Sequence, residues 1–155
     1  MSFLRFARIH LLALLMAWAI WPAGSFARDV FDLSVTGENG TSLFSVEVAD
    51  NDAERARGLM YRRSMADNSG MLFDFGNERD ITMWMRNTYI SLDMLFIDAN
   101  GRIGHIAANT TPLSDTVIPS RIKAQFVLEI NAGIARRQGI EVGDRVHGPA
   151  IDDRL

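Results

Sequence analysis

The first segments after residue 30 alternate apolar and polar positions, which is the period of a β-strand with one face in a core. Residues 31–35 alternate in this way, and residues 43–48 do so more loosely. Between them, Asn39-Gly40 is a pair that tolerates the positive φ angles of a tight turn. The pattern therefore predicts a first β-hairpin.

The same pattern recurs later in the chain. Residues 94–98 are followed by Asn100-Gly101 and then by residues 102–106, which predicts a second hairpin. Residues 124–130 form an apolar run of strand length, and residues 144–147 are expected to be a short last strand.

Two short segments favour helix instead. Residues 53–57 are helix formers, and Asn51 can cap them while Glu54 reaches back to the cap. Near the C-terminus we expect a helix over residues 135–138, capped by Asn131. Short strands, Gly and Asn turns and two small helices indicate a mainly β (α+β) domain, built as an antiparallel sandwich or partly closed barrel with two short helices.

The N-terminus has the pattern of a secretion signal. Arg5 and Arg8 precede an apolar stretch of eleven residues, 11–21, which is too short for a membrane-spanning helix. The small residues Ser25 and Ala27, at the positions that a signal peptidase reads, predict cleavage after Ala27. We therefore expect residues 1–27 to be a cleaved signal peptide, residues 28–155 to form a single domain with no membrane span, and the protein to be periplasmic or secreted.

Composition narrows the classes of function. Residues 28–155 carry 14 basic against 19 acidic side chains, a net charge of −5, which disfavours nucleic acid and anionic lipid as partners. The chain has no cysteine, which removes disulfides and thiolate chemistry. Phosphate-binding glycine loops and known hydrolase motifs are absent, so the sequence indicates no cofactor and identifies no catalytic residue. Oligomeric state stays open.

The run 83–98 places polar groups among large apolar residues, and such groups need partners if they are buried. If the run is extended, Met83, Met85 and Asn87 share one face. Either a structural ion pair or a pocket for a small polar or saccharide ligand would explain the polar set, whose members are Arg86, Asn87, Thr88, Asp93 and Glu129. We take these five as candidate ligand-binding residues of a non-enzymatic module of the cell envelope.

Three alternatives remain open. Asp93 and Glu129 could be the carboxylate pair of an enzyme acting on envelope polysaccharide. Met83 and Met85 would offer two thioethers to Cu(I), although methionine also fills apolar cores. A cluster of arginines around the first helix could be a solvated face or an anion-binding edge; its members are Arg55, Arg57, Arg62 and Arg63.

Several blocks of the chain, taken in order, resemble the family known as domain of unknown function 192. The matching blocks are residues 54–60, 70–75, 84–88, 92–98 and 127–130. This chain has Met83, Arg86 and Ser91 where the family usually has an aromatic residue, a lysine and a proline. The resemblance implies a mainly β sandwich with short helices and no established activity.

Overall fold

The computed structural model describes residues 30–153. The predicted signal peptide, residues 1–27, lies outside the described residues. Within the described part, no helix is long and apolar enough to cross a membrane.

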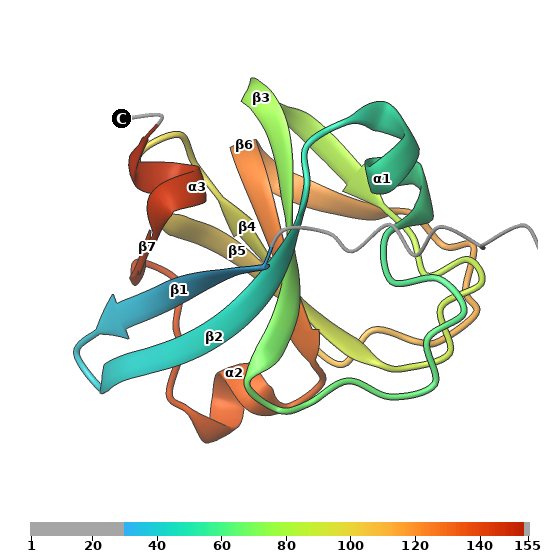
Figure 1. Cartoon of the computed structure of the whole chain (residues 1–155), viewed down its shortest axis with the longest axis horizontal. Helices are drawn as coiled ribbons and strands as arrows, with labels where there is room; N and C mark the ends of the chain where they lie inside the picture. The colour runs from blue at the N-terminus through green and yellow to red at the C-terminus, as the bar shows by residue number, and fades with distance from the viewer. Residues whose placement is uncertain (1–29, 154–155) are drawn as a thin grey trace, which may run out of the picture.

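Seven strands form one sheet, in the order β5-β4-β6-β3-β2-β1-β7 (Figure 1). The bounds of the strands are β1 Val30–Gly37, β2 Gly40–Ala49, β3 Ser69–Met83, β4 Leu92–Ile97, β5 Ile103–Ala107, β6 Ile118–Asn131 and β7 Arg145–His147. Both predicted hairpins are confirmed: β1 pairs with β2 up to Gly37 and Gly40, and β4 pairs with β5 across the Asn100-Gly101 turn. The predicted strands over 124–130 and 144–147 are confirmed within β6 and β7.

The sheet is mixed and curls into a half-barrel. β2 and β3 run parallel, because the chain between them passes through a helix and a long loop, whereas the other neighbouring pairs are antiparallel. The two ends of the sheet approach each other where Arg102 bridges Arg145. Gly101 permits this contact, since it has a φ of +77° and an added Cβ would lie 2.7 Å from the Val146 carbonyl oxygen. The prediction of a mainly β, partly closed barrel is confirmed, with one parallel pair that an antiparallel pattern does not include.

The helices are short, and their caps differ from one another. α1, Asp52–Arg57, begins as predicted, with the Asn51 side chain accepting a hydrogen bond from the Glu54 amide. α2, Ile134–Arg137, begins after Gly133, so the predicted cap by Asn131 is wrong; the Asn131 amide instead donates to the Met65 carbonyl at 2.8 Å. α3, Pro149–Asp152, is a third helix that the sequence pattern did not reveal.

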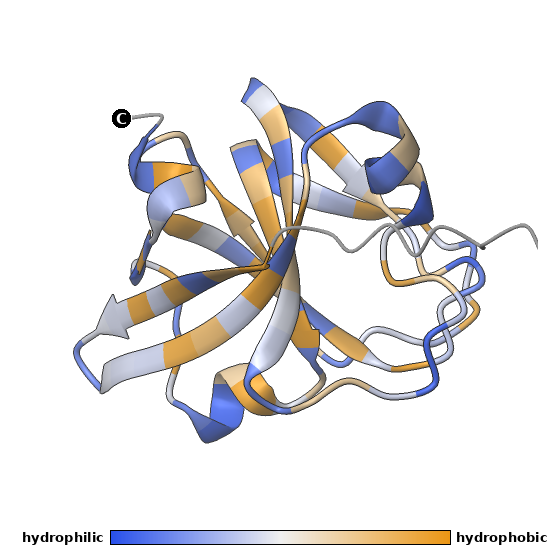
Figure 2. Ribbon diagram, viewed as in Figure 1, coloured by the Kyte–Doolittle hydropathy of each residue, from blue (hydrophilic) through white to orange (hydrophobic). Residues whose placement is uncertain are grey.

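Strands β3, β6 and β4 carry apolar side chains on both faces, and these side chains belong to two separate cores. Figure 2 shows hydrophobic residues along these strands. One core fills the inside of the half-barrel and includes Leu72, Leu95 and Leu128. The other lies on the opposite face and includes Phe73, Met94 and Val127. α1 packs near this second face, so the second core ends at a pocket rather than at a closed wall.

Candidate functional site

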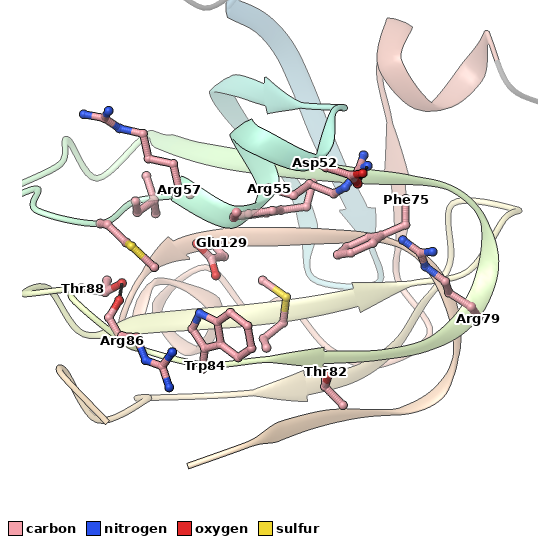
Figure 3. A pocket seen from close by; sticks show the side chains of 16 residues that line it. Asp52, Arg55, Arg57, Phe75, Arg79, Thr82, Trp84, Arg86, Thr88 and Glu129 are labelled. Carbon is pink, nitrogen blue, oxygen red and sulfur yellow. Dashed lines mark hydrogen bonds and ion pairs between the residues drawn. The ribbon is translucent and has the colours of Figure 1, made fainter. Parts of the chain in front are cut away.

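A pocket of about 260 Å³ opens between α1 and the end of β3 (Figure 3). One wall is α1 with the turn that follows it, and the other is the second half of β3 with the loop after it. The base includes one residue of β6, Glu129. The lining residues are 52 and 55–60, then 73, 75, 79, 82 and 83 of β3, then 84, 86 and 88, and finally 129.

Glu129 is a carboxylic acid surrounded by apolar side chains. In the sheet it lies directly opposite Met71 of β3 and Met94 of β4, and both of these methionines are fully buried. Residues opposite each other in a sheet point to the same face, so the acid sits between two thioether side chains. Only 4% of Glu129 is exposed, and burial raises its pKa to about 8. The acid is therefore mostly protonated at pH 7.

The Glu129 carboxyl makes no hydrogen bond or ion pair with any other residue of the described range 30–153. Every fully enclosed side-chain nitrogen or oxygen in that range does have a partner. It follows that the Glu129 oxygens retain some exposure, and Figure 3 shows them directed into the pocket. A protonated carboxyl in this position can donate one hydrogen bond and accept others.

Arg55 joins α1 to β3 and has few free donors left for a ligand. Its Nη1 donates to the carbonyl oxygens of Asp50, at 2.5 Å, and Asp74, at 2.6 Å. Its Nη2 pairs with Asp52 at 2.6 Å, and the guanidinium lies 5.6 Å from the centre of the Phe75 ring. These contacts hold the helical wall of the pocket in place.

Two of the lining arginines, Arg57 and Arg79, are uncompensated cations, but Figure 3 shows the Arg57 guanidinium directed away from the cavity. Neither makes an ion pair with a carboxylate within the described residues. Arg79 stacks over the Phe75 ring at 4.9 Å, from the side opposite the helix in Figure 3. The mouth of the pocket is thus positively charged, while its base holds an acid that is mostly neutral.

A distortion in β3 brings Phe75 and Arg79 to the same pocket. The pairing between β3 and β6 shifts register between Asp74 and Arg79. At the start of this shift the Gly76 amide donates to Asp74 Oδ1 at 2.7 Å, and Gly76 has a φ of +79°. Such irregularities re-aim side chains that a regular strand would place elsewhere.

The loop after β3 carries three of the candidate residues, and it is not extended, so the condition under which Met83, Met85 and Asn87 would share one face is not met. β3 ends at Met83, and the Thr88 amide donates to the Met85 carbonyl at 3.1 Å, which makes a turn. Asn87 adopts a φ of +56°, a conformation that asparagine tolerates better than most residues. As a result Arg86 and Thr88 line the pocket, whereas the Asn87 side chain lies against Met60.

Arg86 makes an exposed ion pair rather than a buried one. Its Nε lies 2.6 Å from Asp115 Oδ1, and its guanidinium is 5.4 Å from the Trp84 ring. The structure therefore pairs Arg86 with neither Asp93 nor Glu129.

Asp93 lies on the other face of the sheet. It pairs with Ile130 in register, so it points into the half-barrel, whereas the next residue points to the face of Glu129. Its two oxygens accept hydrogen bonds from the backbone amides of Asn109, at 2.8 Å, and Ala135, at 3.1 Å. Ala135 is in the first turn of α2, where Gly133 offers no capping side chain. Asp93 thus satisfies this helix terminus from a distance.

The two methionines of the copper hypothesis are not equivalent. Met83 lines the pocket, but Met85 is buried and its sulfur lies 3.2 Å from the Thr110 hydroxyl oxygen. Across the described residues, no group of three or more His, Asp or Glu side chains is placed to hold a metal ion. His105 stacks on Phe96, and burial is the main cause that lowers its pKa.

Several pocket residues were not among the candidates from the sequence. Phe75, Arg79 and Trp84 gave no local signal for a site, because their meeting depends on the β3 distortion and on the position of α1. Arg55 and Arg57 did belong to the arginine cluster for which an anion-binding edge was one interpretation.

Two similar proteins are among the solved structures that match this chain. A crystal structure from Sinorhizobium meliloti 1021, described as a "putative transcription regulator", is 43% identical with a TM-score of 0.80, and the match covers 85% of this chain and 100% of that one. A protein of unknown function from Novosphingobium aromaticivorans DSM 12444 is 38% identical with a TM-score of 0.77, covering 91% of this chain and 99% of that one.

No curated protein matches the sequence. The sequence profile of the DUF192 family, described as "Uncharacterized ACR", matches residues 34–148, which include every strand except the start of β1. The predicted resemblance is thereby confirmed, and the chain belongs to the DUF192 family.

Proposed function

We propose that this protein is a non-enzymatic binding module that holds a small ligand in the pocket above Glu129. The observation that carries the proposal is the buried Glu129 carboxyl, which has no partner within residues 30–153 and faces the pocket. Because the Glu129 oxygens keep some exposure to the pocket, a ligand that pairs with them gains the net free energy of a typical hydrogen bond, about 0.5–1.5 kcal/mol. The apolar wall and the charged mouth supply further contacts, as is usual for small-molecule sites.

The arrangement of the acids favours binding over hydrolysis. Asp93 and Glu129 point to opposite faces of the sheet, so they do not make a carboxylate pair across one cleft. The other acid at the pocket, Asp52, lies at the rim in an ion pair with Arg55. A glycosidase needs two carboxyls facing the same bond, and this pocket offers one.

The test is a protein-observed NMR screen of the full chain against a set of small polar, saccharide and aromatic compounds. We expect the amide shift changes to cluster on α1, the second half of β3 and residues 84–88, and the bound compound to be recovered chemically unchanged. Shift changes confined to another surface would contradict the binding site. Recovery of a cleaved compound would favour the enzyme instead.

We also propose that the domain acts outside the cytoplasm, after loss of residues 1–27. The basic start, the apolar stretch of 11–21 and the small residues before Arg28 support this. Fractionation of a C-terminally tagged protein, followed by N-terminal sequencing, tests it. We expect the protein in the periplasm or medium with Arg28 as its first residue; an intact N-terminus in the cytoplasm would contradict export.

A further inference from the structure

Building on the binding role above, we propose that the ligand is a small organic anion with a flat apolar body. Its charged group meets the arginines at the mouth, and a hydrogen-bond acceptor at its other end meets the Glu129 carboxyl. Three features of the pocket lead to this class of ligand: the charge at the mouth, the character of the walls and the state of the acid at the base.

The charge at the mouth favours an anion over a cation. Four arginines line the pocket, and Arg79 has no carboxylate partner within the described residues. Arg57 has none either, but its guanidinium points away from the cavity (Figure 3). A pocket rim that carries charge of one sign raises the local concentration of ligands with the opposite charge. The Arg79 guanidinium also lies over the Phe75 ring, 4.9 Å from its centre, so it loses little further freedom when it binds a carboxylate or phosphate.

The walls and the size indicate a flat apolar body. Phe75 and Trp84 face the pocket from the β3 side, and Trp84 remains 45% exposed although it is the largest side chain there. Leu59, Met60 and Met83 supply the rest of the apolar surface. At about 260 Å³ the pocket lies just below the usual range for drug-sized ligands, so a body of one or two rings fills it.

The acid at the base selects an acceptor. A neutral carboxyl donates its proton to a carbonyl or ether oxygen of the ligand, and the two side chains opposite it in the sheet, Met71 and Met94, are thioethers that donate no hydrogen bond. Once ionised, the same carboxyl would repel both the acceptor and the anion. Binding should therefore weaken as Glu129 loses its proton.

The experiment uses 6-methoxy-2-naphthoate as the probe, with 2-methoxynaphthalene as the neutral analogue and the matching naphthylmethylammonium as the cationic one. Affinities are measured by titration calorimetry on the full chain. At pH 6 we expect the anion to bind at least about tenfold more tightly than either analogue. At pH 9 we expect its apparent affinity to be about tenfold lower, because about a tenth of the protein retains the proton one unit above a pKa of about 8.

Variants separate the two ends of the ligand. Glu129→Gln keeps a donor but does not titrate, so its affinity for the anion should match that of the parent at pH 6 and stay within about twofold at pH 9. Arg79→Gln should weaken binding of the anion about threefold to tenfold and leave binding of the neutral analogue unchanged, whereas Arg57→Gln, whose guanidinium points away from the cavity, should weaken the anion less than Arg79→Gln does. The matched control is Arg136→Gln, an exposed arginine of α2 that lies outside the pocket.

The outcomes distinguish the ligand class from the binding role itself. If the neutral or cationic analogue binds in the pocket as tightly as the anion, the ligand class is wrong while the binding module stands. If the parent and Glu129→Gln lose anion affinity equally at pH 9, the acceptor role of Glu129 is wrong. If none of the three compounds binds, the ligand class is overturned, and the binding role is then decided by the NMR screen described above.

Discussion

The surroundings of Asp93 and of Glu129 differ more than their sequences suggest. Both are acids in apolar strands of one sheet, and both are buried. Asp93 accepts hydrogen bonds from two backbone amides, and these bonds join β4 to the 108–109 segment and to α2. Glu129 has no such partner within the described residues, and burial raises its pKa to about 8. The hydrogen-bond partners of a buried acid, rather than its burial alone, separate a structural role from a binding role.

The largest expected effect is the pH dependence of stability contributed by Glu129. Its pKa is raised in the folded state, so between about pH 4.5 and 8 the unfolded chain releases this proton while the folded chain retains it. Stability therefore falls with rising pH over that window, by up to about 5 kcal/mol. In Glu129→Gln this loss should vanish, leaving the variant more stable than the parent at pH 9 and similar to it at pH 4.

Urea unfolding of both proteins from pH 4 to pH 9 measures the effect, since the other titrating groups cancel in the difference. A constant difference across this range would mean that Glu129 is already ionised in the fold. The contrast with Asp93 would then fail.

Asp93→Asn should be the most destabilising neutral replacement among the candidate residues, by about 3 kcal/mol. The amide of asparagine accepts through only one end, so either the Asn109 or the Ala135 N–H is left facing another donor. The free energy of unfolding at pH 7 measures this change, with the exposed Asp115→Asn as the matched control. A loss no larger than that of the control would remove the structural role from Asp93.

Local turn chemistry explains why part of the fold could be predicted. Two Asn-Gly pairs located both hairpins, and Asn51 with Glu54 located α1, because these signals act over a few residues. The α2 cap was misplaced since the group that satisfies it, Asp93, is 42 residues away in sequence. The parallel pairing of β2 and β3 likewise depends on tertiary packing, which no short pattern records.

The candidate site was predictable in its chemistry but not in its geometry. Alternation along the strands correctly places Asp93 with Leu95 and Glu129 with Val127. The alternation does not predict which face of the sheet is covered by a closed core and which face borders a pocket. That depends on where α1 lies and on the β3 distortion that turns Phe75 and Arg79 toward it.

Thr110, like Asp93, is a buried polar residue whose hydrogen bonds are made within the fold, and its side chain is smaller and uncharged. Its buried hydroxyl donates to the Leu92 carbonyl at 2.9 Å and accepts from the Leu92 amide at 3.2 Å. Thr110→Val keeps the shape and removes both bonds, so we expect a loss of about 1–2 kcal/mol in urea unfolding. Thr110→Ser, which keeps the hydroxyl, should lose less; the reverse order would show that packing, not hydrogen bonding, holds this loop.

The smallest effect is expected for Arg86→Met. The ion pair between Arg86 and Asp115 is short, but its two side chains are 56% and 67% exposed, and exposed pairs contribute about 1 kcal/mol or less. In about 1 M salt, the difference in unfolding free energy between Arg86→Met and the parent should become smaller. Lys123→Met is the matched comparison, because the ion pair between Lys123 and Asp80 is similarly exposed and should respond to salt in the same way. A loss of about 3 kcal/mol in unfolding free energy that salt does not reduce would show that Arg86, like Asp93, has a structural role. A small loss leaves its guanidinium available at the mouth of the pocket, where the fold does not depend on it.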